Sequence, residues 1–215
     1  MTEVNAEIIK PFGPSIFKVK IPKQIVDDLN QYVDKTVADE TKANALNYGN
    51  QLIGDVTQEF KLEEDFMKQI GWLGFLGNCT SNWIHNVTGN KIKNFAIMDS
   101  WIVRQFENEY NPIHYHTGHI SGAGFLKVPD ELGEFSQDKE KSERYNPGGN
   151  LNLIHGSKMF LSESSIFIKP IVGDFYFFPH YLMHSVYPFK GTDQERRSIS
   201  FNALIDEDVF NVYKE

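Results

Sequence analysis

Short strand-like segments dominate the second half of the chain and limit the folds open to it. Each is rich in β-branched and aromatic residues and is bounded by turn-forming residues, which is typical of strands joined by short connections. Eight such segments are predicted, at residues 95–106, 113–117, 121–128, 149–154, 165–169, 174–178, 184–188 and 196–205. So many short strands after helical segments favour a mainly β fold, a β-sandwich or jelly roll.

The N-terminal part is expected to support this β-structure with helices. Residues 7–21 resemble an opening strand interrupted by prolines and a glycine. Apolar residues at helical spacing predict an amphipathic helix at residues 23–38 and a second helical segment at residues 62–84, which its glycines weaken. Residues 47–55 are polar and turn-rich, and a loop is predicted there.

A chain of 215 residues is long enough for one sizeable core. We therefore expect one domain, residues 1–215, in which residues 1–94 form a helical N-terminal support and residues 95–205 the jelly-roll core. Residues 130–149 are polar, charged and too long for a hairpin, and a lid over the rim of the site is predicted there.

Charge and cysteine content narrow the range of partners and compartments. The formal net charge is −8 and the lysines and arginines are not clustered, which argues against nucleic acid as a partner. The only cysteine, Cys79, excludes an internal disulfide and a thiolate zinc site, so a reducing compartment, the cytoplasm, is predicted. No apolar run approaches 18 residues and no signal peptide is seen, so no membrane association is expected. Nothing in the sequence indicates an oligomeric state.

Three histidines lie within six residues of the segment 100–119, directly after a predicted strand. Residues two apart in a strand point to one face, so His114 and His116 are expected to project side by side. Two imidazoles on one face suit a divalent metal ion. His119 competes with His116 for this role.

A third ligand is expected from a distant part of the chain. A Gly-Asp turn leads into four consecutive aromatic residues and a proline, which predicts a short buried strand entering a tight bend. His180 and His184 follow that strand, and His184, beyond the bend, is the nominated ligand.

The last predicted strand has one polar face. Alternation places Arg196, Ser198, Ser200 and Asn202 on one side, and Arg197, Ile199, Phe201 and, roughly, Leu204 on the other. A polar inward face close to a metal is expected to bind a ligand.

Together these segments resemble the Fe(II)/2-oxoglutarate-dependent oxygenases, in particular a bacterial and phage branch distantly related to prolyl hydroxylases. The resemblance covers residues 100–202, about half of the chain. Its motifs are Pro112-x-His-x-His116, Pro170-x-x-Gly-Asp174, His184-x-Val-x-Pro188 and Arg196-x-Ser-x-Ser-Phe-Asn202.

The resemblance implies a double-stranded β-helix that binds Fe(II), with 2-oxoglutarate and O₂ as co-substrates. It implies oxidative decarboxylation of 2-oxoglutarate to succinate and CO₂, coupled to hydroxylation of an unactivated C–H bond. By resemblance, His114 and His184 bind the iron, Arg196 binds the distal carboxylate of 2-oxoglutarate, and Ser198 adds a hydrogen bond. No catalytic residue beyond the metal ligands is implied.

Two positions depart from the family pattern. His116 stands where relatives have Asp or Glu, so either the site has three histidines, or a carboxylate from elsewhere or a water completes the coordination sphere. Because no better-placed carboxylate lies nearby in the sequence, His116 is predicted to be the ligand. Gln105 stands where prolyl-hydroxylase relatives tend to have a tyrosine, and this leaves the substrate, a small molecule or a peptide, open.

Two other functions fit some of the same residues. Gly173-x5-Pro179-x4-His184 also fits the second cupin motif, although cupins lack the Arg-x-Ser strand and usually have a glutamate after the first histidine pair. A non-catalytic binding module with bystander histidines is the third possibility.

Overall fold

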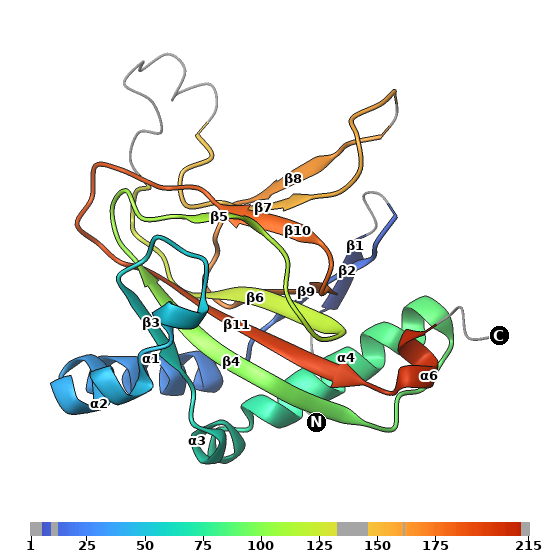
Figure 1. Ribbon diagram of the computed structural model, residues 1–215, viewed down its shortest axis with the longest axis horizontal. Helices are drawn as coiled ribbons and strands as arrows, with labels where there is room; N and C mark the ends of the chain where they lie inside the picture. Colours follow the sequence, from blue (N-terminus) through green and yellow to red (C-terminus); the bar gives the residue numbers. More distant parts are fainter. Residues whose placement is uncertain (1–5, 10–12, 133–145, 161, 212–215) are drawn as a thin grey trace.

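Two antiparallel β-sheets and a layer of helices form the fold (Figure 1). The computed structural model describes residues 6–9, 13–132, 146–160 and 162–211. The larger sheet lies between the helices α1, α3 and α4 on one side and the smaller sheet on the other. This mainly β architecture confirms the predicted fold class, a double-stranded β-helix supported by N-terminal helices.

The strands of the larger sheet, in spatial order, are β1 (Ala6–Ile9), β2 (Ile16–Lys20), β9 (Asp174–Pro179), β6 (Ile120–Lys127), β11 (Arg196–Ile205), β4 (Phe95–Gln105) and β3 (Gln58–Lys61). Those of the smaller sheet are β5 (Asn111–His114), β10 (Met183–Val186), β7 (Leu151–Ile154) and β8 (Ser165–Ile168). The helices are α1 (Lys23–Val37), α2 (Glu40–Leu46), the 3₁₀ turn η1 (Gly49–Gln51), α3 (Glu64–Gln69), α4 (Trp72–Thr88) and α6 (Glu207–Phe210).

All eight strands predicted after residue 95 are present, as β4 to β11. The bounds of several predicted strands differ from the observed ones, and two elements were predicted wrongly. The strand predicted at 113–117 ends at His114, and the helix predicted at 62–84 is two helices, because Gly71 takes a left-handed conformation (φ 77°) between α3 and α4. The predicted lid at 130–149 lies largely outside the described residues and stays a prediction.

The main core fills the space between the helices and the larger sheet. Leu29 of α1 and Trp72 of α4 are fully buried there against Phe175, Phe177 and Phe201 of the sheet. These are the apolar faces of an amphipathic helix and of alternating strands, so burial of both follows directly from sequence pattern.

The side chains of β11 alternate between the two faces of the larger sheet, as predicted, and this determines which of them face the smaller sheet. Ile199, Phe201 and Ala203 lie in the helix-side core, and the residues between them face the smaller sheet. Leu204 was wrongly assigned to the buried face, since it is 38% exposed and Ile205 is buried instead. The strict two-residue period therefore continues to the end of the strand.

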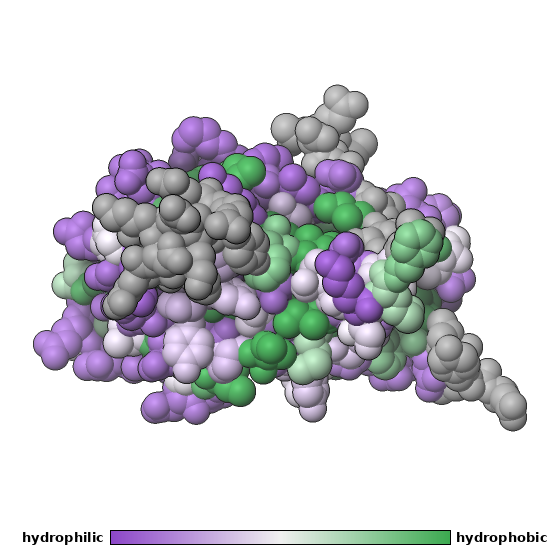
Figure 2. All heavy atoms as spheres, turned by 90° about the horizontal axis from the view of Figure 1, so that it is seen from above, coloured by the Kyte–Doolittle hydropathy of each residue, from purple (hydrophilic) through white to green (hydrophobic). Residues whose placement is uncertain are grey.

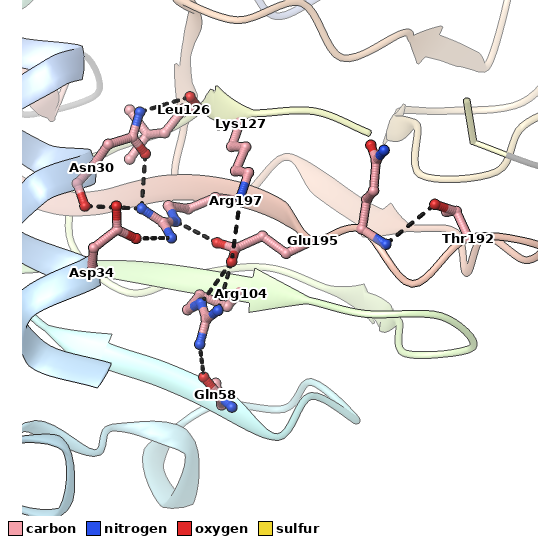
Figure 3. Close-up of polar contacts among 10 residues, drawn as sticks. Asn30, Asp34, Gln58, Arg104, Leu126, Lys127, Thr192, Glu195 and Arg197 are labelled. Atoms are coloured by element: carbon pink, nitrogen blue, oxygen red, sulfur yellow. Dashed lines mark hydrogen bonds and ion pairs between the residues drawn. The ribbon is translucent and has the colours of Figure 1, made fainter. Parts of the chain in front are cut away.

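A polar network fastens the start of β11 to α1 (Figure 3). Arg197 Nη2 donates to Asp34 Oδ1 (2.7 Å), and Nη1 donates to the backbone carbonyl of Asn30 (3.0 Å). Glu195 accepts from Arg197 Nε (2.5 Å) and from Arg104 Nη2 (2.6 Å). Burial alone raises the pKa of Glu195, but these two guanidinium groups outweigh it and lower the pKa to about 2.

The surface seen from the side of the smaller sheet mixes hydrophilic and hydrophobic residues (Figure 2). Exposed apolar residues of this sheet include Ile113 of β5 and Met183 of β10. Across the part of the chain that the structure describes, no helix is both long and apolar enough to cross a membrane.

Candidate functional site

A cavity of about 290 Å³ lies between the two sheets. This volume is at the lower end of the range typical of small-ligand sites. The polar face of β11 lines it, as predicted, with Arg196, Ser198, Ser200 and Asn202. His114, His116 and His184 line it too, so the structure brings together all five predicted site residues.

The three histidines form one cluster. His114 and His184 lie directly opposite each other in the antiparallel pair β5–β10, with ring centroids 4.2 Å apart. The ring of His116 lies 5.1 Å from that of His114 and 4.7 Å from that of His184. One nitrogen from each ring lies within 4.8 Å of the others, so one ion could contact all three.

His116 reaches the cluster by a route that strand alternation did not predict. It lies beyond the end of β5, and its backbone N–H donates to the carbonyl of His180 (3.0 Å), which directly follows β9. A contact between distant segments therefore sets its position.

Hydrogen bonds orient two of the rings. His114 Nδ1 lies 2.7 Å from the carbonyl of Pro112, and His184 Nδ1 lies 2.8 Å from the carbonyl of Leu182. A carbonyl only accepts, so each Nδ1 carries the proton and each Nε2 keeps a lone pair for a metal.

Burial keeps the cluster neutral. It lowers the pKa of His114 and of His184, and it lowers that of His116 to about 3, with the neighbouring imidazole of His114 adding to the shift. Neutral imidazole is the form that binds metals. His116 Nδ1 is also buried without a hydrogen-bond partner among the described residues. The donor set thus fits a divalent ion such as Fe(II).

Within the described residues, the cluster contains no carboxylate. His119, the competing candidate, is elsewhere: its Nδ1 accepts the backbone N–H of Ile205 (3.1 Å) and its ring stacks on Phe210 at 3.8 Å. His180 contributes its backbone carbonyl rather than its ring.

Arg196 is a buried cation that has no counter-ion among the residues that the structure describes. It is 1% exposed, and no carboxylate among the described residues pairs with it. Its Nε donates to the carbonyl of Gly149 (2.8 Å), and its Nη1 donates to Gln105 Oε1 (3.2 Å) and Ser198 Oγ (3.3 Å). Burial lowers the pKa of Arg196 to about 9, because desolvation disfavours the charged form. A ligand carboxylate would supply one.

Gln105, the second departure from the family pattern, positions that arginine. Its Oε1 accepts from Arg196 while its Nε2 donates to the carbonyl of Glu109 (2.5 Å), so the amide is held from both ends. It therefore acts on the guanidinium rather than on the cavity, whose wall it does not form.

Sequence reasoning missed one wall of the cavity. It comes from the predicted loop at 47–55, from β3 and from the inner face of β4: Tyr48, Gln51, Leu52, Ile53, Glu59, Asp99 and Trp101. The predicted loop at 47–55 could have indicated this wall, because binding residues are often carried by loops beside a rigid scaffold.

Residues 99–202 match a family model described as "Putative 2OG-Fe(II) oxygenase". That segment contains the three histidines, Arg196 and Ser198. A search of curated proteins gave no match.

Solved structures show the same fold. The chain is similar to a Pseudomonas putida prolyl-4-hydroxylase, with a TM-score of 0.58 and 14% identity over 93% of this chain and 92% of that one. It is also similar to the collagen prolyl hydroxylase of Paramecium Bursaria Chlorella virus-1 in complex with 2OG, with a TM-score of 0.52 and 15% identity over 92% and 94%. A third similar structure is AviO1 from Streptomyces viridochromogenes Tue57, with a TM-score of 0.57 and 10% identity over 89% of this chain and 90% of that one. At such identities the likeness is one of fold, whereas the family model matches the segment that carries the site. The family model of the 2OG-Fe(II) oxygenases thus matches just under half of the chain, and the matched segment contains every predicted metal- and co-substrate-binding residue.

Proposed function

We propose that His114, His116 and His184 bind Fe(II), and that Arg196 and Ser198 bind the distal carboxylate of 2-oxoglutarate. The observation that carries this proposal is that a neutral three-histidine cluster and an unpaired buried guanidinium line one cavity. A dicarboxylate that bridges them would give Arg196 its missing counter-ion.

Bound Fe(II) supplies the activation of O₂ that couples oxidative decarboxylation of 2-oxoglutarate to hydroxylation of a C–H bond. The chain's own residues position the reactants. The carbonyls of Pro112 and Leu182 fix two of the imidazoles, while Gln105 and the carbonyl of Gly149 hold the guanidinium in place. Such preorganisation limits the orientations open to the co-substrate.

A three-histidine set changes the electrostatics of the centre. Neutral imidazoles leave the metal with its full double charge, whereas a carboxylate ligand would cancel half of it. A metal held by this set would therefore attract the dianionic co-substrate more strongly, in addition to the attraction from Arg196. Both contributions favour a 2-oxo dicarboxylate over a neutral ligand.

The substrate that we propose is a small molecule or a peptide with an unactivated C–H bond. A prolyl-hydroxylase-like reaction is supported by the names of two structural neighbours, a prolyl-4-hydroxylase and a collagen prolyl hydroxylase. The cupin and non-catalytic alternatives are not favoured, because the segment that carries the site matches a 2OG-Fe(II) oxygenase model and the structural neighbours include prolyl hydroxylases.

The remaining aspects of this function are proposals from composition. One domain, residues 1–215, would carry the whole activity. The net charge of −8 supports a substrate other than nucleic acid, and the single cysteine, Cys79, buried and unpaired, supports a cytoplasmic location.

The test is co-substrate turnover. Purified protein given Fe(II), 2-oxoglutarate and O₂ is expected to form succinate even without a prime substrate, measured by NMR. His184→Ala and Arg196→Leu should each abolish this, while His180→Ala, outside the cluster, should not. Absence of succinate from iron-loaded wild-type protein would contradict the proposal.

A further inference from the structure

Glu59 is a buried carboxylate on the cavity wall for which the proposed reaction has no use. It lies on the edge strand β3 and is 2% exposed. Its Oε2 is buried without a hydrogen-bond partner, and no described side chain forms an ion pair with it. A buried charged group without a partner destabilises a fold, so its presence calls for a functional reason.

The strand register aims this carboxylate at the site. Glu59 lies opposite Val103 of β4, and Val103 lies opposite Ser198 of β11. Residues directly opposite on antiparallel strands point to the same side of the sheet. Glu59 and Ser198 therefore face the same cavity across two strand spacings, about 10 Å apart.

The other charged side chains among the described residues of the cavity wall have a partner of opposite charge or would gain one from the co-substrate. Asp99 on the same wall forms an ion pair with Lys61, and the co-substrate would match Arg196. Burial raises the pKa of Glu59 to about 7, and the charge of Glu109 adds to this shift. A cation beside Glu59 would lower that pKa again and stabilise the ionised form.

Two aromatic residues line the cavity on the same wall as Glu59. Tyr48 and Trp101 line the cavity with ring centroids 6.1 Å apart, and the Tyr48 N–H donates to the Glu59 carbonyl (2.8 Å). The Tyr48 ring already holds one ammonium group, since Lys61 Nζ lies 5.3 Å from its centroid, and a carboxylate on the same wall as such rings is chemistry that suits a further ammonium group. The Trp101 ring also lies 5.5 Å from that of His116, so this wall adjoins the histidine cluster.

We propose that Glu59, with Tyr48 and Trp101, binds an ammonium group of the prime substrate. This inference rests on the proposed function, because it takes the cavity to be the substrate site. It assigns the substrate to amine-bearing compounds, whose ammonium group could belong to a free small molecule or to a peptide amino terminus.

The probes are n-butylammonium and its uncharged counterpart N-butylacetamide, with tetraglycine and N-acetyl-tetraglycine as the peptide pair. Binding is measured by calorimetry at about pH 8, where Glu59 is ionised and an amine remains charged, on protein loaded with Mn(II) and 2-oxoglutarate. The proteins are wild type, Glu59→Gln, and Asp99→Asn as a cavity carboxylate that already has a partner.

Wild type is expected to bind at least one charged probe about tenfold or more tightly than its uncharged counterpart, and Glu59→Gln should abolish that preference. Asp99→Asn should keep it. If the protein prefers n-butylammonium to N-butylacetamide but does not distinguish the two peptides, the substrate is a small molecule. If it prefers tetraglycine to N-acetyl-tetraglycine, the substrate is a peptide. The melting temperature of Glu59→Gln should equal or exceed that of wild type, whereas a purely structural glutamate would give a lower one.

A wild-type protein without preference for either charged probe would overturn the inference, as would an unchanged preference in Glu59→Gln. The titration of 2-oxoglutarate that precedes the probes separates this failure from failure of the proposed function. If 2-oxoglutarate binds and the preference is absent, only the ammonium site is wrong; if 2-oxoglutarate does not bind, the proposed function itself fails.

Discussion

His114 and His184 are opposite partners in the β5–β10 pair, and each ring donates its Nδ1 proton to the carbonyl two residues before it. The same local geometry thus fixes the tautomer on both strands without any metal. Iron binding would need no change of protonation at these two rings, whereas His116 has no such carbonyl at its Nδ1 among the described residues.

His116 should therefore decide iron retention. His116→Ala is expected to lower iron affinity at least tenfold, because one of three ligands is lost, whereas His116→Asp should retain iron through a carboxylate. Iron content after desalting measures both. His180→Ala is the control, since its backbone carbonyl still receives the His116 N–H. Full iron occupancy in His116→Ala would show that His116 is no ligand.

Arg196→Leu should weaken 2-oxoglutarate binding by about 2–5 kcal/mol, because a desolvated carboxylate loses its charged partner. The free energy of unfolding should stay equal or rise, since a buried cation without a counter-ion is removed. Calorimetric titration and urea unfolding measure the two effects. Equal 2-oxoglutarate affinity in wild type and variant would exclude Arg196 as the carboxylate partner.

The adjacent arginine should show the opposite behaviour. Arg197→Leu removes a partner of the buried Glu195, so stability should fall by about 3–5 kcal/mol. Its guanidinium contacts α1 and not the cavity, so 2-oxoglutarate affinity measured at low temperature should change little. A large loss of affinity in the folded variant would mean that the two faces of β11 are coupled.

Glu195 should contribute to acid sensitivity. Its pKa is about 2 in the folded protein against roughly 4.3 in an unfolded chain, so its contribution of about 3 kcal/mol is fully present above pH 4.3 and is lost as pH falls through 2. Urea unfolding at pH 7, 5 and 3 should show a smaller loss in Glu195→Gln than in wild type. Glu40→Gln, at an exposed position, should lose stability as wild type does. Identical pH slopes in all three proteins would refute the assignment.

Two glycines should respond oppositely to alanine. A Cβ at Gly124 would lie 2.8 Å from the Asp174 carbonyl oxygen and closer still to the Phe175 ring, so Gly124→Ala should destabilise by about 1–3 kcal/mol or more. Gly74, inside α4, has open space around its Cβ position, and Gly74→Ala should stabilise by roughly 0.5–1 kcal/mol. Melting temperatures of both variants test this. Similar shifts would contradict the packing of β6 against β9.

The sequence was sufficient where a local pattern determines the outcome. The alternation of β11 predicted its polar face, and spacing of apolar residues predicted α1, because in both cases one face meets the core. Leu204 was misplaced because it was grouped with the apolar face although strict alternation puts it on the opposite side.

Tertiary contacts account for what was missed. Strand alternation favoured His116 over His119, but it did not predict the hydrogen bond to the distant His180 carbonyl that His116 makes beyond the end of β5, nor the packing of His119 on Phe210. Glu59 lies in a strand of four residues, too short and polar to be recognised, and its burial comes from Tyr48 and neighbouring strands. Neither the His116–His180 hydrogen bond nor the burial of Glu59 leaves a periodic pattern of residues in the sequence.

The adjacency of Arg196 and Arg197 restricts how this strand can change its length. Insertion or deletion of a single residue just after Arg197 would turn Ser198, Ser200 and Asn202 toward the helices or, if those residues keep their register, would exchange the faces of the two guanidiniums. Both parts of the strand keep their faces only if changes come in pairs of residues. In this part of the chain, a one-residue length change should therefore be far more damaging than most substitutions, and two-residue changes should be the tolerated kind.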